Sequence, residues 1–137
     1  MKKIILSVAV VSFAVLSCKK DKTCDLNGSS IVGSYKVSSV KYKASASAPE
    51  VDEFATWDAC EKDDVITFNA SNTVTFQDAG AVCVPPGDDT GIWTLVGNDL
   101  NIDGQAFKVA YFDCNSAAIQ IVGPGAGETY TISLARQ

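Results

Sequence analysis

Histidine is absent from the 137 residues of this chain, and that absence limits its chemistry. Without an imidazole the chain has neither a histidine proton shuttle nor a histidine-containing metal site. Basic side chains are also few: 11 lysines and arginines stand against 16 aspartates and glutamates, for a net charge of −5. Nucleic acid and anionic lipid surfaces attract basic patches, so an acidic chain is a poor partner for either. The carboxylates, serines and lysines have no spacing typical of catalysis, so we expect no enzymatic activity and no cofactor.

No apolar run is long enough to span a membrane as a helix, which needs about 20 apolar residues. The apolar stretch Ile4–Leu16 has 13 residues and follows two lysines, a pattern typical of a signal peptide. At its end, Val15-Leu16-Ser17-Cys18 resembles the lipobox of bacterial lipoproteins, whose cysteine receives diacylglycerol. We therefore predict a lipoprotein signal peptide over residues 1–17, lipidation of Cys18 and a flexible, lipidated tether over residues 18–30. A plain secretory signal that is cut elsewhere is the alternative.

Cysteine pairs with CxxC spacing are missing as well. The four cysteines after Cys18 are separated by 36, 23 and 31 residues: Cys24, Cys60, Cys83 and Cys114. A zinc site of four thiolates typically contains closely spaced pairs, whereas an even number of cysteines in an exported chain is typical of disulfides. We therefore expect two disulfide bonds and no metal site.

Short segments after Ser30 alternate apolar and polar residues with a period of two, which is typical of strands with one buried face. The clearest pair predicts a hairpin with Phe68 opposite Val74 and Ile66 opposite Phe76. No stretch forms a convincing amphipathic helix, and only residues 57–62 are compatible with one turn of helix. We expect eight strands, over residues 33–43, 65–69, 73–77, 90–96, 100–102, 106–113, 117–122 and 130–134.

Five of the seven connections between these strands are short turns. Short turns favour an up-and-down barrel over an immunoglobulin-like sandwich, because the sandwich needs Greek-key crossovers. We therefore predict an all-β fold, an eight-stranded antiparallel up-and-down barrel, over residues 31–137. The two long connections, 44–63 and 78–89, then lie at one end of the barrel, which we call the mouth; the opposite end is the base. Binding residues concentrate on such loops.

This strand order also predicts how the cysteines pair. Cys60 and Cys83 lie in the two mouth connections, whereas Cys24 precedes the first strand and Cys114 follows the sixth, both at the base. Strands of about six to ten residues separate the two ends by roughly 20–30 Å, and a disulfide needs Cα atoms within about 7 Å of each other. Of the three connectivities that four cysteines allow, only Cys60–Cys83 with Cys24–Cys114 fits.

Four short motifs resemble the lipocalin-like lipoproteins of Bacteroidota-type bacteria: Cys18-Lys19-Lys20-Asp21, Gly33-Ser34-Tyr35, Cys60–Asp64 followed by Ile66–Asn69, and Gly91–Leu95. Lipocalins have Gly-x-Trp at the start of the first strand, and Tyr35 stands at the tryptophan position here. The resemblance implies an eight-stranded barrel that holds an apolar ligand, without naming that ligand. The start at Cys18 also resembles signals for surface export, so a lipid-anchored outer-membrane protein is expected. Whether it faces the periplasm or the cell surface stays open.

Two functions follow from these observations. A carrier would bind a small apolar ligand in a cavity of about 300 Å³ or more. Its candidate contacts are Trp57, near the mouth, and four residues on predicted strands: Phe68, Phe76, Trp93 and Tyr111. Core packing is the alternative role for the strand residues, because small barrels can be filled by side chains.

The second function is that of a non-enzymatic accessory or adhesion module. Such a module would have a filled barrel and contact a protein or glycan through the 44–63 and 78–89 connections. Two aspartate pairs lie near the mouth, Asp63-Asp64 and Asp88-Asp89. Their spacing matches no EF-hand-like pattern, so we interpret them as a solvated acidic rim rather than a calcium site.

Overall fold

The computed structural model describes residues 24–137, so the predicted signal peptide, Cys18 and the first part of the predicted tether lie outside the described residues. Within the described part, no helix is both long and apolar enough to cross a membrane. The elements in chain order are β1 (Gly33–Lys43), β2 (Val51–Asp52), the 3-10 helix η1 (Phe54–Thr56), α1 (Ala59–Lys62), β3 (Val65–Phe68), β4 (Thr73–Gln77), β5 (Asp89–Val96), β6 (Asp99–Ile102), β7 (Gln105–Phe112), β8 (Ser116–Val122) and β9 (Thr129–Arg136).

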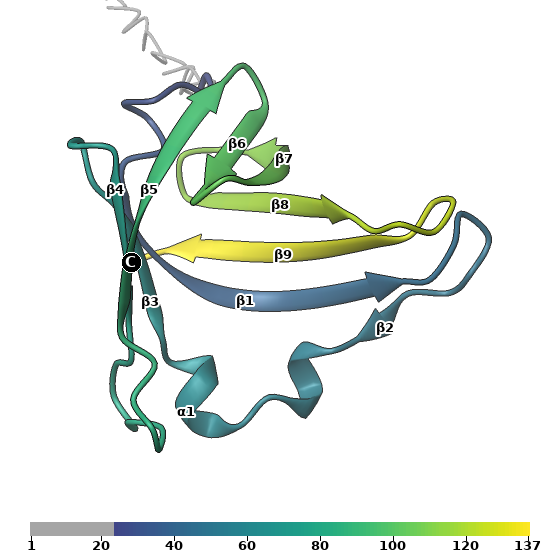
Figure 1. Cartoon of the computed structure of the whole chain (residues 1–137), viewed down its shortest axis with the longest axis horizontal. Helices are drawn as coiled ribbons and strands as arrows, with labels where there is room; N and C mark the ends of the chain where they lie inside the picture. Colours follow the sequence, from purple (N-terminus) through teal and green to yellow (C-terminus); the bar gives the residue numbers. More distant parts are fainter. Residues whose placement is uncertain (1–23) are drawn as a thin grey trace, which may run out of the picture.

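Eight of these strands form a closed antiparallel barrel (Figure 1). β1 pairs with β3, each strand from β3 to β9 pairs with the next along the chain, and a β1–β9 pairing closes the sheet. The two-residue strand β2 adds to the mouth end of β1, where Lys41 lies opposite Asp52. The predicted eight-stranded up-and-down barrel is therefore confirmed, and the turn of helix expected near residues 57–62 is α1.

The hairpin of β3 and β4 has the register that the alternating pattern predicts. Phe68 lies opposite Val74 and Ile66 opposite Phe76. The turn between them places Asn72 at a φ of 62°, a left-handed conformation that asparagine tolerates better than most residues. One face of this hairpin therefore points inward for its whole length.

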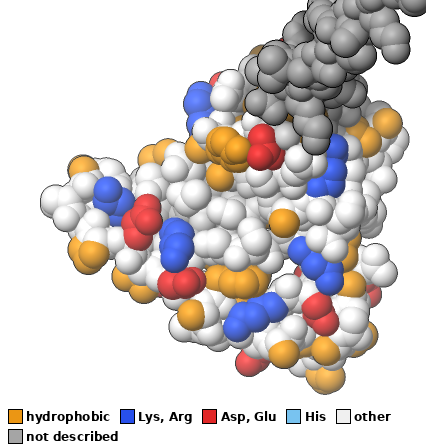
Figure 2. Space-filling model, turned by 180° about the vertical axis from the view of Figure 1, so that it is seen from behind, with side chains coloured by type: hydrophobic (Ala, Val, Ile, Leu, Met, Phe, Trp, Pro, Cys, Tyr) orange, Lys and Arg blue, Asp and Glu red, His pale blue; other side chains and the backbone are white. Residues whose placement is uncertain are grey.

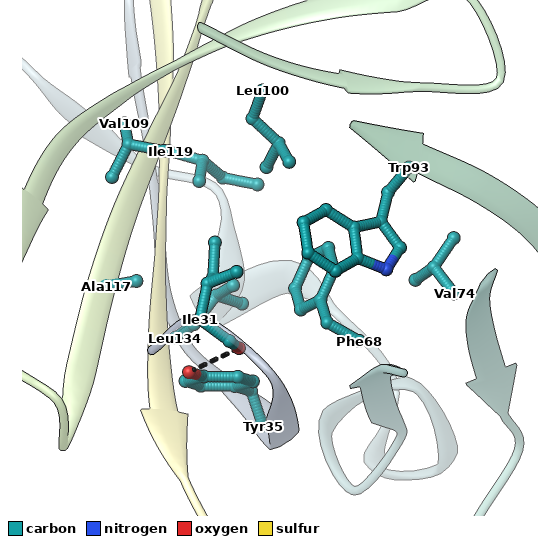
Figure 3. Close-up of a cluster of buried hydrophobic side chains, with 10 residues drawn as sticks. All are labelled: Ile31, Tyr35, Phe68, Val74, Trp93, Leu100, Val109, Ala117, Ile119 and Leu134. Atoms are coloured by element: carbon teal, nitrogen blue, oxygen red, sulfur yellow. Dashed lines mark hydrogen bonds between the residues drawn. The ribbon is translucent and has the colours of Figure 1, made fainter. Parts of the chain in front are cut away.

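The hydrophobic core lies in the base half of the barrel, and Figure 3 shows its buried side chains. Trp93 on β5 packs edge-on against Phe68, with ring centroids 5.5 Å apart, and its Nε1–H donates to the carbonyl of Asn69 at 3.1 Å. Because the indole N–H has this partner, the tryptophan is buried without an unmet donor. The buried cluster is Ile31, Tyr35, Phe68, Val74, Trp93, Leu100, Val109, Ala117, Ile119 and Leu134.

Arg136, at the end of β9, covers the base of this core. Its Nη2 donates to the carbonyls of Ser30 and Val32, at 2.8 and 2.6 Å, and to the hydroxyl of Tyr35 at 3.0 Å. The guanidinium also lies over the Tyr35 ring, 5.2 Å from its centroid. Tyr35 in turn donates to the carbonyl of Ile31 at 2.9 Å, as Figure 3 shows. One side chain thus ties the last strand to the segment that precedes the first.

Two disulfides tie the ends of the barrel, in the two pairs expected from the strand order. Cys60–Cys83 joins α1 to the β4–β5 loop at the mouth, with Cα atoms 5.3 Å apart. Cys24–Cys114 joins the segment before β1 to the β7–β8 turn at the base, with Cα atoms 5.6 Å apart. Residues 24–30, expected to be the end of the tether, form a turn in which Asn27 Oδ1 accepts two backbone hydrogen bonds. Residues 24–30 are therefore part of the folded domain.

Charged side chains of both signs cover the outer surface. On the face that Figure 2 shows, acidic and basic groups are interspersed with apolar ones. The ion pairs between described residues, Lys41–Asp52 at 3.3 Å and Lys108–Asp99 at 2.8 Å, are solvent-exposed. Such pairs contribute little to stability, so the core, the disulfides and the Arg136 contacts hold the fold together.

Candidate functional site

A cavity of about 450 Å³ occupies the mouth half of the barrel. Its wall is made by ten apolar side chains from β1, β3, β4, β6, β7, β8 and β9: Val37, Val65, Ile66, Phe68, Phe76, Ile102, Phe107, Ile119, Ile132 and Leu134. Phe68, Ile119 and Leu134 also belong to the buried core, so they form the floor of the cavity. The other seven are only half-buried, because they face this open space.

Trp57 lies at the mouth of the cavity, between η1 and α1. Its ring packs against Phe54, with centroids 5.4 Å apart, and it lines the cavity beside Glu61. The short helix α1 is held by a capping box, in which the Glu61 carboxylate accepts the backbone N–H of Asp58 at 2.8 Å. The Cys60–Cys83 disulfide fixes the same helix to the opposite mouth loop, so Trp57 is held on a constrained segment.

Asp78 shapes the second mouth loop, between β4 and β5. This carboxylate is only 8 % exposed and accepts the backbone N–H groups of Cys83 and Gly87, at 3.0 and 2.9 Å. The N–H of Asp78 donates to Asp88 at 3.0 Å, and Asp63 accepts the N–H of Ala81 at 2.8 Å. Asp63 and Asp88 thus have structural partners and are more than a solvated rim. Within residues 24–137, no group of side chains is placed to hold a metal ion.

Four polar side chains line the mouth of the cavity, and three of them are acidic: Glu61, Asp64, Asp103 and Gln105. The Oδ1 atom of Asp64 is shielded from solvent and has no hydrogen-bond partner among the described residues. Burial, followed by the negative charge of Asp78, raises the pKa of Asp64, while a hydrogen bond from the Ala79 backbone opposes that shift. Asp103 Oδ1 accepts the N–H of Ile92 at 2.8 Å. The mouth therefore presents negative charge beside an apolar wall.

Three of the five residues predicted as ligand contacts line this cavity: Trp57, Phe68 and Phe76. Trp93 points inward but lies in the base core, 3 % exposed, behind Phe68. Trp93 therefore has the alternative role, core packing, and does not line the cavity.

Tyr111 lies outside the barrel, which corrects the other prediction. It is 54 % exposed, and its hydroxyl donates to Asp113 at 2.8 Å. Phe107 and Val109 point inward, but the pairing of β7 with β8 shifts by one residue between Val109 and Tyr111. Such a β-bulge reverses the alternation that follows it, so Phe112 points inward in place of Tyr111.

The acidic lining residues were not among the predicted ligand contacts. Asp64 belongs to the predicted rim, and Asp103 lies between the predicted strands 100–102 and 106–113. The signal that locates Asp103 is present in the sequence, because in an up-and-down barrel the β6–β7 turn lies at the same end as the two long loops. The direction of the Asp103 side chain within that turn is seen only in the structure.

A family model described as the lipocalin-like domain matches residues 31–117, which extend from the buried Ile31 into β8. No curated protein matches the chain. The closed eight-stranded antiparallel barrel agrees with the matched family, and the rest of β8 and all of β9 complete the barrel beyond the matched residues. On the matched residues and this architecture, the chain belongs to the lipocalin-like domain family.

Proposed function

We propose that this protein is a carrier that binds one small apolar ligand inside its barrel. The observation that supports this proposal best is the cavity of about 450 Å³ with its wall of apolar strand side chains. Ligand sites in proteins have volumes of about 300–1,000 Å³ and are mostly apolar. A ligand would bury the half-exposed wall residues and gain about 25 cal/mol for each Å² of apolar surface removed from water.

We also propose that the carrier is a lipoprotein of the outer membrane, anchored through Cys18 and facing the periplasm or the cell surface. The lipobox motif supports the anchor. The Cys24–Cys114 disulfide lies at the base of the barrel, and Cys18 precedes Cys24 by six residues. A lipid at Cys18 would therefore hold the base towards the membrane and leave the mouth free to exchange ligand.

One observation favours the accessory-module function. Val82 and Val84, in the β4–β5 loop at the mouth, are 59 % and 98 % exposed. Exposed apolar side chains on a loop tip are suited to contact with a protein or a glycan. This function does not need a cavity, so substitutions of wall residues separate it from the carrier function.

An apolar dye whose emission depends on its environment tests the carrier function. We expect saturable binding with one dye per chain, together with quenching of Trp57 fluorescence. Trp57→Ala should weaken binding by about tenfold, since about 1.4 kcal/mol of aromatic contact is lost.

Tyr111→Ala is the matched control, because this exposed aromatic lies outside the cavity. It should leave the affinity for the dye unchanged. An absence of saturable binding would contradict the carrier function and favour the accessory module. Lipid extraction of protein purified from its native source, followed by mass spectrometry, would then identify the natural ligand of a confirmed carrier.

A further inference from the structure

We propose that the ligand of this cavity has a positively charged group, such as a protonated amine, at one end of an apolar body. The apolar body would lie against the strand wall, and the cationic group would lie at the mouth beside Asp64. This inference rests on the proposed carrier function and narrows it to one class of ligand.

The charges around the cavity carry the argument. Glu61, Asp64 and Asp103 all line the cavity, and no lysine or arginine of the described residues does. Lys62 is near in sequence, but its Nζ lies 5.6 Å from the Phe54 ring centroid and donates to the Ala55 carbonyl at 3.4 Å. The ion pairs of the described part join other acidic residues. The negative charge at the mouth is therefore not neutralised by the protein's own cations.

The three carboxylates differ in their hydrogen bonds within the protein and in their surroundings. Glu61 caps α1 by accepting the N–H of Asp58, and Asp103 accepts the N–H of Ile92. Asp64 has a shielded Oδ1 atom without a partner. Asp64 is also only partly exposed, whereas Glu61 and Asp103 are exposed, so water would screen a ligand cation least beside Asp64.

The surroundings of Asp64 strengthen its preference for a cation. Carboxylates attract charged donors more strongly where the apolar wall lowers the local dielectric constant. Burial and the charge of Asp78 raise the pKa of Asp64, and a cation beside it would stabilise the ionised carboxylate again. A carboxylate or phosphate on the ligand would meet like charges at the same place and bind less tightly.

Three unbranched compounds of ten carbon atoms each test this inference: decylammonium, decanol and decanoate. Each competes with a neutral apolar dye for the purified protein at pH 7, where a primary alkylamine is protonated. We expect decylammonium to bind about tenfold more tightly than decanol, and decanoate to bind most weakly. Asp64→Asn should remove most of the tenfold preference and leave the affinity for decanol within about twofold.

Asp99→Asn is the matched control, because it removes the same charge from an exposed residue in the β5–β6 hairpin at the base. It should leave the preference for decylammonium intact. Equal affinities of the wild-type protein for all three compounds would overturn the cation preference while the carrier function stands. Binding of the dye without displacement by any of the three compounds would likewise overturn the cation preference. Failure of the dye itself to bind would overturn the carrier function. The wild-type comparison decides the question even if Asp64→Asn does not fold.

Discussion

Contacts of a few side chains at the base help to close this barrel. Arg136 donates to two carbonyls of the segment that precedes β1 and to the hydroxyl of Tyr35 on β1, and its guanidinium lies over the Tyr35 ring. Burial of Tyr35 raises the pKa of its hydroxyl, and the charge of Arg136 opposes that shift. The hydroxyl therefore stays protonated at neutral pH, where it donates to Ile31 and accepts from Arg136.

We expect Arg136→Met to lower the free energy of unfolding by about 1–3 kcal/mol, because two carbonyls and a hydroxyl lose a charged donor. Urea denaturation with both disulfides intact measures the change. Arg136→Lys should recover only part of the loss, since an ammonium does not reproduce the planar fork of a guanidinium.

Lys41→Met serves as the control for this substitution, because the Lys41–Asp52 pair is exposed. It should change the unfolding free energy by less than about 1 kcal/mol. If Arg136→Met were as mild as Lys41→Met, the Arg136 contacts would not be what closes the base.

Phe76 and Tyr111 show when the sequence predicts correctly which side chains face the interior of the barrel, and when it does not. Phe76 lies on a regular strand, so the period of two places it inside the barrel, and the structure agrees. Tyr111 follows a bulge in β7, where one extra residue turns it outward. A bulge leaves no distinct signature in a single sequence, because the apolar residues Val109, Ala110, Tyr111 and Phe112 fit either face.

At the scale of elements, the two mouth loops and their disulfide define the rim of the cavity. Removal of Cys60–Cys83 by a double substitution to serine should cost about 3 kcal/mol of stability, because the bond spans 23 residues. The folded variant should also bind the apolar dye more weakly, since the loops must then be ordered on binding. Denaturation and dye titration measure the two effects.

The base disulfide supplies the matched comparison. Cys24–Cys114 spans 90 residues, so its removal should cost about 4–5 kcal/mol of stability. It lies far from the mouth, and we expect the folded variant to keep the dye affinity of the wild type. The reverse ranking, with weaker binding after loss of the base disulfide, would contradict the role given to the mouth loops.

Element prediction succeeded for the barrel strands and failed inside the long connections. Tight turns such as Gly97-Asn98 mark the ends of the regular strands. β2 and η1 lie within the 44–63 connection, and neither was predicted. The two-residue β2 exists because it pairs with the exposed end of β1, a tertiary contact that no local pattern encodes.

For the whole molecule, the order of the strands could be predicted from the sequence. Whether side chains fill the interior of the barrel could not. In an up-and-down barrel, successive loops alternate between the two ends. This alternation gives the end at which each loop lies and, from that, the two cysteine pairs. Whether the interior is filled depends on the sum of side-chain volumes within a particular curvature. The base half is filled by the core around Trp93 and Phe68, while the side chains of the mouth half leave a cavity of about 450 Å³ between them.

The proposed anchor makes a prediction at the same scale. Cys18→Ser should release the protein from membranes into the soluble fraction, because the lipid on this cysteine would be its attachment. Cell fractionation and immunoblotting measure the distribution. The released protein should still form both disulfides, which excludes misfolding as the cause of release. A variant that stays with the membrane fraction would show that the attachment lies elsewhere.

The bond between Cys24 and Cys114 has a mechanical consequence. A pull on the chain upstream of Cys24 divides at this residue between the path into β1 and the covalent link to the β7–β8 turn. Tension is therefore shared by two distant parts of the barrel, and β1 is protected from being peeled away from β9 one hydrogen bond at a time. A protein held by its N-terminus against flow or a bound partner would keep its cavity intact under forces that unravel an uncrosslinked barrel.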